Sequence, residues 1–187
     1  TIGGAIANNY GGQLSGQYVV VGDWVKRLEV VLANGDIIET SRINRRELDK
    51  KKGLQSFEGE IYRKIDGIIE DNQSIINDKI ANKNRDNTGY PGIAKVKERD
   101  GSFDLTPLII GSQGTLGIIS EIVMRTDYYS SEESVVVASF GDAKSARDAI
   151  NTIIDLRPSS LEYMDGSLFE NASKYGKKYP FLSLDSS

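Results

Sequence analysis

Apolar and polar residues first alternate regularly between residues 27 and 40. In RLEVVLANGDIIET, every second residue from Leu28 to Leu32 is a large aliphatic one, and Asn34-Gly35 separates this run from Ile37 and Ile38. Such alternation is typical of a half-buried β-strand. Because Asn-Gly favours the positive φ angles of a type I′ turn, the segment predicts a β-hairpin.

Farther along the chain, the apolar residues take up a helical period. Between Phe57 and about Asn72, isoleucines recur on one face of a helix, and Glu58 and Glu60 in its first turn suit the positive end of the helix dipole. These isoleucines are Ile61, Ile65, Ile68 and Ile69. A weaker helical stretch is expected through Ile75, Ile76 and Ile80. The polar residues 82–102, interrupted by glycine and proline, predict a long loop, and such loops in compact domains are usually functional.

A different pattern begins after the polar residues near position 130. The segment SVVVASF, residues 134–140, predicts a strand, and LEYM, residues 161–164, predicts another. Between them, Asp142 is placed to cap a helix with apolar residues at helical spacing, namely Ala146, Ala149, Ile150, Ile153 and Ile154. Strand, helix and strand in succession indicate a second α+β module, with its boundary between Tyr128 and Glu132.

Two segments are rich in glycine. LIIGSQGTLGIISEIVMR, residues 108–125, has Gly111, Gly114 and Gly117 between two apolar runs. It is neither a P-loop nor the dinucleotide fingerprint, and its glycine spacing alone favours a tight strand connection with a bulge. TIGGAIANNYGGQ, residues 1–13, adds four more glycines, Gly3, Gly4, Gly11 and Gly12, around Asn8 and Asn9. Two glycine-lined turns in one chain indicate a site for an extended ligand, because glycine lets a ligand approach the main-chain N–H groups.

Composition excludes several classes of site. The chain has 187 residues, 39% of them apolar, a net charge of −4, and neither cysteine nor histidine. Disulfides, thiolate nucleophiles, cysteine-ligated metals and a Ser-His-Asp triad are therefore excluded. The negative net charge gives no positive electrostatic potential that would attract nucleic acid. We expect Lys50, Lys51 and Lys52 to lie in a solvated loop. The sequence has no apolar run of membrane-spanning length and no signal-peptide pattern, and its start at Thr1 within a glycine-rich motif is expected of a piece of a longer protein.

Three segments in order carry a resemblance to a known family. TIGGAIANNYGG, DWVKRLEVVLANGDIIET and DLTPLIIGSQGTLGIISEIVMR resemble the FAD-binding domain of the vanillyl-alcohol-oxidase and p-cresol methylhydroxylase type. The branch is similar to the FAD-linked oxidases that include glycolate oxidase and D-lactate dehydrogenase. The family pattern GSEGTLGIIT differs at Gln113 and Ser120. SLEYMDGSLFE resembles the beginning of the family's C-terminal cap domain.

The resemblance implies which residues bind FAD. The first segment would pass along the flavin and pyrophosphate with Gly3, Gly4, Asn8 and Asn9. The last would lie on the pyrophosphate, ribose and adenine side with Gly111, Ser112, Gly114, Thr115, Gly117, Ile118 and Ile119. In it, the amides of Gly114 and Gly117 would face the cofactor, the two isoleucines would serve packing, and a valine at Gly117 would block FAD at little cost to the fold. DNTGY resembles a family loop near the flavin and adds Asn87, Gly89 and Tyr90, for which an ordinary polar turn is the equal alternative.

The implied fold is α+β. Residues 1–129 would form the second subdomain of the FAD-binding domain, a mostly antiparallel sheet with flanking helices and a helical insert at about 44–83, and residues 130–187 would begin the cap. The parent protein would be cytoplasmic or peripheral to a membrane and would oxidise a small 2-hydroxy acid or related alcohol, passing hydride to the flavin. This fragment would bind FAD weakly or not at all, would contribute no catalytic base or metal site, and could form a homodimer through its incomplete cap. A non-catalytic binding module and an unrelated α+β interaction domain are the alternatives. The sequence identifies neither the substrate nor the electron acceptor.

Overall fold

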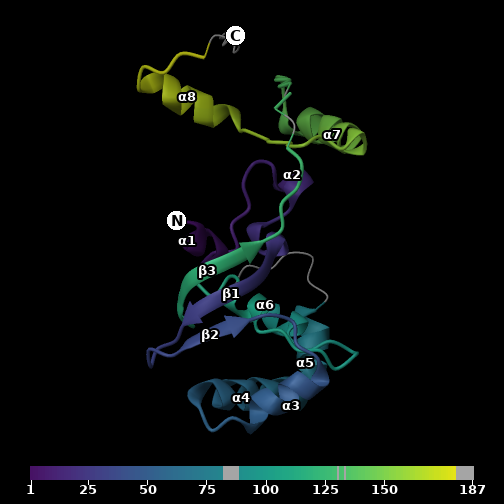
Figure 1. Cartoon of the computed structure of the whole chain (residues 1–187). Helices are drawn as coiled ribbons and strands as arrows, with labels where there is room; N and C mark the ends of the chain where they lie inside the picture. The colour runs from purple at the N-terminus through teal and green to yellow at the C-terminus, as the bar shows by residue number, and fades with distance from the viewer. Residues whose placement is uncertain (82–88, 130, 133, 180–187) are drawn as a thin grey trace. The chain divides into compact units, whose positions relative to one another are not determined.

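The computed structural model describes residues 1–81, 89–129, 131–132 and 134–179. The chain divides into two compact units (Figure 1). Unit 1 consists of Thr1–Gly11 and Val20–Asp127, and unit 2 consists of Gly12–Val19 and the residues from Tyr128 onward. Each unit is described by itself.

Unit 1 is built on a three-stranded sheet of order β2-β1-β3, in which both pairs of neighbours are antiparallel. The strands are β1 (Val25–Val31), β2 (Ile37–Thr40) and β3 (Ile118–Met124). β1 and β2 form the expected hairpin, with Val31 opposite Ile37 and Leu28 opposite Thr40. The antiparallel sheet with flanking helices agrees with the predicted α+β class.

The turn of the hairpin is not of type I′. Of its two expected positive-φ residues, only Gly35 has a positive φ, at 86°. The N–H of Gly35 donates to the carbonyl of Leu32 at 2.9 Å, and the N–H of Leu32 donates to Asp36 at 2.8 Å. This is the longer hairpin loop in which a tight turn is followed by one left-handed glycine, so the prediction of the hairpin was right and that of its turn type was wrong.

Two short helices cover the inner face of the sheet. α1 (Ile2–Ala7) packs on β3, and α6 (Thr106–Ile109) packs on β1. Side chains from both helices join those of the hairpin in one apolar cluster, which consists of Ile6, Leu28, Val30, Leu32, Ile38 and Ile109. Leu28 and Val30 are fully buried, as the alternating pattern of β1 predicts.

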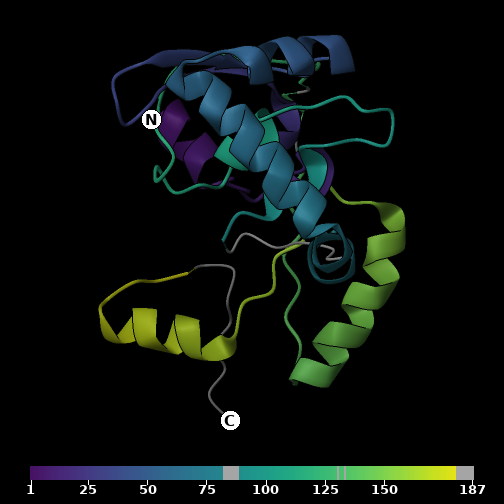
Figure 2. The same cartoon turned by 90° about the horizontal axis from the view of Figure 1, so that it is seen from below.

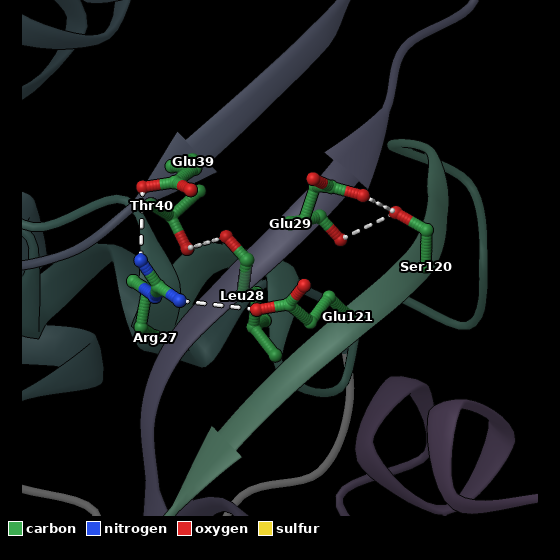
Figure 3. Close-up of polar contacts among 7 residues, drawn as sticks. All are labelled: Arg27, Leu28, Glu29, Glu39, Thr40, Ser120 and Glu121. Atoms are coloured by element: carbon green, nitrogen blue, oxygen red, sulfur yellow. Dashed lines mark hydrogen bonds and ion pairs between the residues drawn. The ribbon is translucent and has the colours of Figure 1, made fainter.

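The outer face of the sheet carries a row of glutamates, one on each strand (Figure 3). Glu29 on β1 stands opposite Glu39 on β2 and opposite Glu121 on β3. Arg27 bridges the two outer members, with its guanidinium 3.1 Å from Glu39 and 3.0 Å from Glu121. The hydroxyl of Ser120 donates to the carboxylate of Glu29 at 2.8 Å. One arginine and one hydroxyl thus hold together a row whose members would otherwise repel each other.

The segment between β2 and the long loop is helical. α3 (Arg45–Gly53) and α4 (Phe57–Asp71) lie side by side (Figures 1 and 2), and α5 (Gln73–Ile75) and the π-helix η2 (Ile76–Ile80) follow. A second apolar cluster joins these helices to residues 96–108. It consists of Leu48, Tyr62, Ile69, Ile76, Val96, Phe103, Leu105 and Leu108.

Two predictions about this helical region were wrong. The helical period placed Ile68 on the apolar face of α4. Its side chain is 49% exposed, because Tyr62 and Asp66 occupy the buried face together with Ile69. The lysines at 50, 51 and 52 form the last turn of α3 and not a loop, and the C-terminus of a helix favours such positive charges. The capping box between Asn44 and Glu47 fixes the start of that helix.

Asp66 is the only charged side chain in the buried part of α4 within the described residues. Its carboxylate pairs with Lys52 and, at 2.6 Å, with Lys97, which also lies 2.8 Å from Glu70. Burial raises the pKa of Asp66, but the hydrogen bonds and charges of the two lysines outweigh this and hold the pKa below its usual value. These ion pairs connect α3, through Lys52, and α4, through Asp66, to Lys97 in the expected loop.

The expected long loop is partly ordered structure. Residues 82–88 lie outside the described residues, but Pro91–Lys95 form a short 3₁₀ helix, η3, and Phe103 forms bridges with Ile43 and Lys97. Val96, between them, is fully buried. A second 3₁₀ helix, η1 (Val21–Trp24), leads into β1.

Unit 2 contains α2 (Ser15–Tyr18), α7 (Ala143–Ile153), the 3₁₀ helix η4 (Ile154–Leu156) and α8 (Gly166–Lys174). Asp142 caps α7 as predicted, accepting the N–H groups of Lys144 and Ser145. The strands expected at 134–140 and 161–164 are absent from the described parts of those segments. Val135 and Val136 are 86% and 90% exposed, and a strand without a hydrogen-bonded neighbour is not stable alone. In the described ranges, no helix has both the length and the apolar character that crossing a membrane requires.

Candidate cofactor site

The first glycine-rich segment forms a helix and not the expected turn. Thr1 caps α1 by accepting the N–H of Gly4 at 3.1 Å. A Cβ on Gly3 would lie 3.4 Å from the carbonyl oxygen of Ile119 on β3. Gly3 therefore lies in van der Waals contact with β3, and the packing of α1 on this strand favours a helix in a segment whose glycines disfavour one.

The second glycine-rich segment is attached directly to the end of α1. The N–H of Gly111 donates to the carbonyl of Ile6 at 3.0 Å, and that of Gln113 donates to Ala7 at 2.8 Å. The side-chain amide of Gln113 also donates to Asn8 at 3.0 Å, over a separation of 105 residues. The structure thus brings together the two segments that the sequence predicted to share a ligand.

Asn9 holds a third segment in place, which sequence reasoning missed. Asn9 has a φ of 49°, and its side-chain oxygen accepts the N–H of Gly22 at 3.2 Å. A Cβ on Gly22 would lie only 2.6 Å from that oxygen. Gly22 is a single glycine in the mainly apolar stretch VVVGDWV, residues 19–25, so no glycine pattern marks it. Its role depends on Asn9, which is 13 residues away.

Gly114 and Gly117 have different surroundings. Gly114 is exposed, with a φ of 77°, and a Cβ there would meet nothing within 4 Å. Among the described residues, no acceptor is found for its N–H. A Cβ on Gly117 would lie 2.6 Å from a methyl group of Val30 and 2.7 Å from the carbonyl oxygen of Val31. The expectation that a valine at Gly117 would leave the fold intact is therefore wrong, because this glycine packs against β1.

Thr115 connects the glycine turn to the loop segment that contains Tyr90. The Thr115 hydroxyl donates to the carbonyl of Ser112 at 2.6 Å, and the N–H of Thr115 bonds to the same carbonyl at 3.1 Å. The hydroxyl of Tyr90 lies 2.8 Å from that of Thr115. Ser112 itself is buried, whereas Thr115 and Tyr90 are exposed. Tyr90 thus joins the segment after residue 88 to the glycine turn.

The remaining predicted residues differ in their surroundings. Ile119 packs on the inner apolar cluster, as expected, but Ile118 is 72% exposed on the outer face and does not serve packing within the described residues. Gly89 is exposed with a φ of 63°. Asn87 lies outside the described residues.

We call Asn8, Asn9, Tyr90 and residues 111–115 the glycine-turn cluster. Its side chains are amides, hydroxyls and one phenol, and it contains no charged side chain. Such groups can hold a polar ligand by hydrogen bonds but cannot supply a strong base at neutral pH. In the part of the chain that the structure describes, no three acidic side chains are grouped so that they could hold a metal ion.

Comparisons with known proteins found one matching family and several relatives. Residues 1–41 match the family described as FAD binding domain. The chain is 30% identical over 177 residues to a D-2-hydroxyglutarate dehydrogenase of Pseudomonas putida, covering 93% of this chain and 17% of the relative. It is 28% identical over 167 residues to the glycolate oxidase subunit GlcD of Bacillus subtilis, covering 88% and 24%. It is 27% identical over 167 residues to a mitochondrial D-lactate dehydrogenase [cytochrome] of Arabidopsis thaliana, covering 88% and 20%.

The chain thus spans between 17% and 24% of the length of these three relatives. No solved structure matches it. The expected resemblance is confirmed: over most of its length the chain is similar to dehydrogenases and oxidases of 2-hydroxy acids, and its first 41 residues match the FAD binding domain family.

Proposed function

We propose that the glycine-turn cluster is a part of the FAD site of an oxidoreductase. The observation that carries this proposal is that residues near positions 8, 90 and 114, predicted separately to contact FAD, are joined by the hydrogen bonds from Gln113 to Asn8 and between Tyr90 and Thr115. The match of residues 1–41 to the FAD binding domain family supports the choice of ligand.

The groups present fit a dinucleotide. The N–H of Gly114 is exposed in a left-handed turn, where a main-chain donor can reach an anionic pyrophosphate without obstruction by a Cβ. The amides of Asn8 and Gln113 and the hydroxyl of Tyr90 can bond to sugar or ring groups. No carboxylate belongs to the cluster, so none would repel the phosphates.

We infer that the full-length protein acts on a small 2-hydroxy acid or a related alcohol, because the relatives are named for D-2-hydroxyglutarate, glycolate and D-lactate. Bound FAD would accept the hydride, and with it the two electrons, of this oxidation. The chain has no histidine, and the cluster has no base. Its residues would therefore bind and orient the cofactor, and the proton acceptor for the alcohol would come from outside the cluster.

We further propose that residues 130–187 begin a cap domain that follows the FAD-binding part. The similarity to longer relatives extends over 88% to 93% of the chain, which requires it to continue past the first 129 residues. The exposed valines at 135 and 136 would be covered by further parts of such a domain or by a second copy of the chain.

The test compares FAD binding by the full-length protein with that of two glycine variants. Gly114→Ala and Gly35→Ala both place a methyl group at a positive φ, 77° and 86°, with nothing within 4 Å. Their backbone strain is therefore matched, but only Gly114 belongs to the cluster. We expect Gly114→Ala to weaken FAD binding at least tenfold and Gly35→Ala to leave it unchanged.

FAD titrations followed by flavin fluorescence measure both affinities. Equal affinities in the two variants would contradict the placement of the cofactor at Gly114. No FAD binding by the unaltered full-length protein would contradict the proposed function and would favour a non-catalytic binding module instead.

A further inference from the structure

The direction of one hydrogen bond in the glycine-turn cluster follows from the number of protons available. A threonine hydroxyl has one proton to donate. Thr115 directs it to the carbonyl of Ser112 at 2.6 Å, and a carbonyl can only accept. The contact of 2.8 Å between the hydroxyls of Tyr90 and Thr115 therefore has Tyr90 as its donor. The phenolic proton of Tyr90 is committed to Thr115.

This commitment determines what the Tyr90 oxygen can offer a ligand. With its proton engaged, the oxygen has only its lone pairs left, so it can accept a hydrogen bond but cannot donate one. Tyr90 is 44% exposed and bonds directly to the residue that follows Gly114. The cluster thus exposes an acceptor, the Tyr90 oxygen, next to a donor, the N–H of Gly114, so a ligand could donate to the first and accept from the second.

We infer that Tyr90 accepts a hydrogen bond from an N–H or O–H group of the ligand and that it does not bind a phosphate oxygen, which has no proton to give at neutral pH. This inference rests on the proposed FAD site. In FAD, the matching groups are the flavin imide, the adenine amino group and the sugar and ribityl hydroxyls. Thr115 is the positioning residue, since its hydroxyl orients the phenol without touching the ligand in this role.

The experiment is a double-perturbation cycle in the full-length protein. The wild-type protein and Tyr90→Phe are titrated with FAD and with four analogues that each lack one donor: 3-methyl-FAD without the imide N–H, a purine analogue without the adenine amino group, and two deoxy analogues that lack the ribose 2′-hydroxyl and the ribityl 2′-hydroxyl. We expect one analogue to bind the wild-type protein about tenfold more weakly than FAD, and to bind Tyr90→Phe as tightly as FAD does, since one hydrogen bond is then already lost. The analogue that shows this identifies the ligand group.

Variants of Thr115 separate orientation from packing. Thr115→Ser keeps the hydroxyl and should keep the wild-type discrimination between FAD and that analogue. Thr115→Val keeps the volume but removes the acceptor, so the phenol can turn and the discrimination should fall below about threefold. Tyr175→Phe, an exposed tyrosine in unit 2, is the control and should behave as wild type.

Two results would overturn the inference. If Tyr90→Phe discriminates against every analogue as strongly as the wild-type protein does, Tyr90 accepts no hydrogen bond from the ligand. If Thr115→Val retains the full discrimination, Thr115 does not orient the phenol. Both results require that the wild-type protein binds FAD, whereas absence of FAD binding by the wild-type protein would refute the proposed function itself.

Discussion

Gly114→Ala and Gly117→Ala should differ widely in their effect on stability, although the two glycines are three positions apart. At Gly114, the only penalty is the strain of a side chain at a φ of 77°, about 1 kcal/mol. At Gly117, φ is 157°, and the methyl group would also stand 2.6 Å from Val30 and 2.7 Å from the main-chain oxygen of Val31. Backbone strain of about 1–3 kcal/mol and overpacking of similar size then add to about 2–6 kcal/mol.

Urea unfolding followed by circular dichroism measures the two free energies of unfolding. For a chain of this length, about 3 kcal/mol corresponds to a fall in Tm of roughly 6–12 °C, and about 1 kcal/mol to roughly 2–4 °C. Gly35→Ala, at a φ of 86° with nothing near its Cβ, should match Gly114→Ala. If Gly117→Ala is no less stable than these two variants, Gly117 does not pack against β1, and close packing does not explain why a glycine occupies this position.

Three other perturbations test the polar contacts. Asp66→Asn should reduce the free energy of unfolding by about 2–3 kcal/mol at pH 7, because it leaves Lys52 without its anion and Lys97 with only Glu70. A loss smaller than about 0.5 kcal/mol in urea titrations would contradict this. Since the pKa of Asp66 is lowered by folding, its contribution is complete above about pH 4 and is lost as the pH falls through the lower folded-state pKa, so Asp66→Asn should flatten that part of the stability profile in acid titrations. Arg63→Met should cost about 1 kcal/mol in thermal unfolding, because the guanidinium donates to two carbonyls at the end of α3; an unchanged Tm would show that water replaces it. Glu29→Gln should stabilise the sheet by about 0.5 kcal/mol at low salt, because it removes a charge that faces two glutamates and keeps the hydrogen bond to Ser120. The gain should be smaller in about 1 M salt, and a loss of stability at low salt would refute the repulsion.

Local patterns in the sequence were enough to predict several elements. The hairpin at Asn34-Gly35 and the helix capped by Asp142 are specified by neighbouring residues, and both are found. α4 was also predicted with its start at Phe57, because its apolar period is strong. The helical period placed Ile68 on the apolar face, but Asp66 takes part of that face because of its partners Lys52 and Lys97, 14 and 31 residues away.

The candidate site was predictable only in part. The resemblance grouped Asn8, Tyr90 and Thr115 as contacts of one ligand, but no sequence pattern states that Tyr90 bonds to Thr115 or that Gln113 bonds to Asn8. Gly3 was read as a turn glycine, since its close approach to β3 depends on a strand more than a hundred positions away. The strands expected at 134–140 and 161–164 failed for a related reason: β-propensity describes a segment, whereas a strand also requires a neighbour.

The attachment of α1 to the glycine turn has a consequence for how the protein is made. A helix of six residues with two glycines is not stable in isolation, so α1 depends on partners such as Gln113, which is 105 residues from Asn8. A ribosome adding about 5–20 residues per second needs roughly 5–20 seconds for that distance. During this time Ile6, fully buried in the folded chain, lacks Ile109, the member of its apolar cluster that is synthesised last. α1 is therefore synthesised well before its partners, and a chaperone that binds short apolar segments would find it exposed throughout that interval.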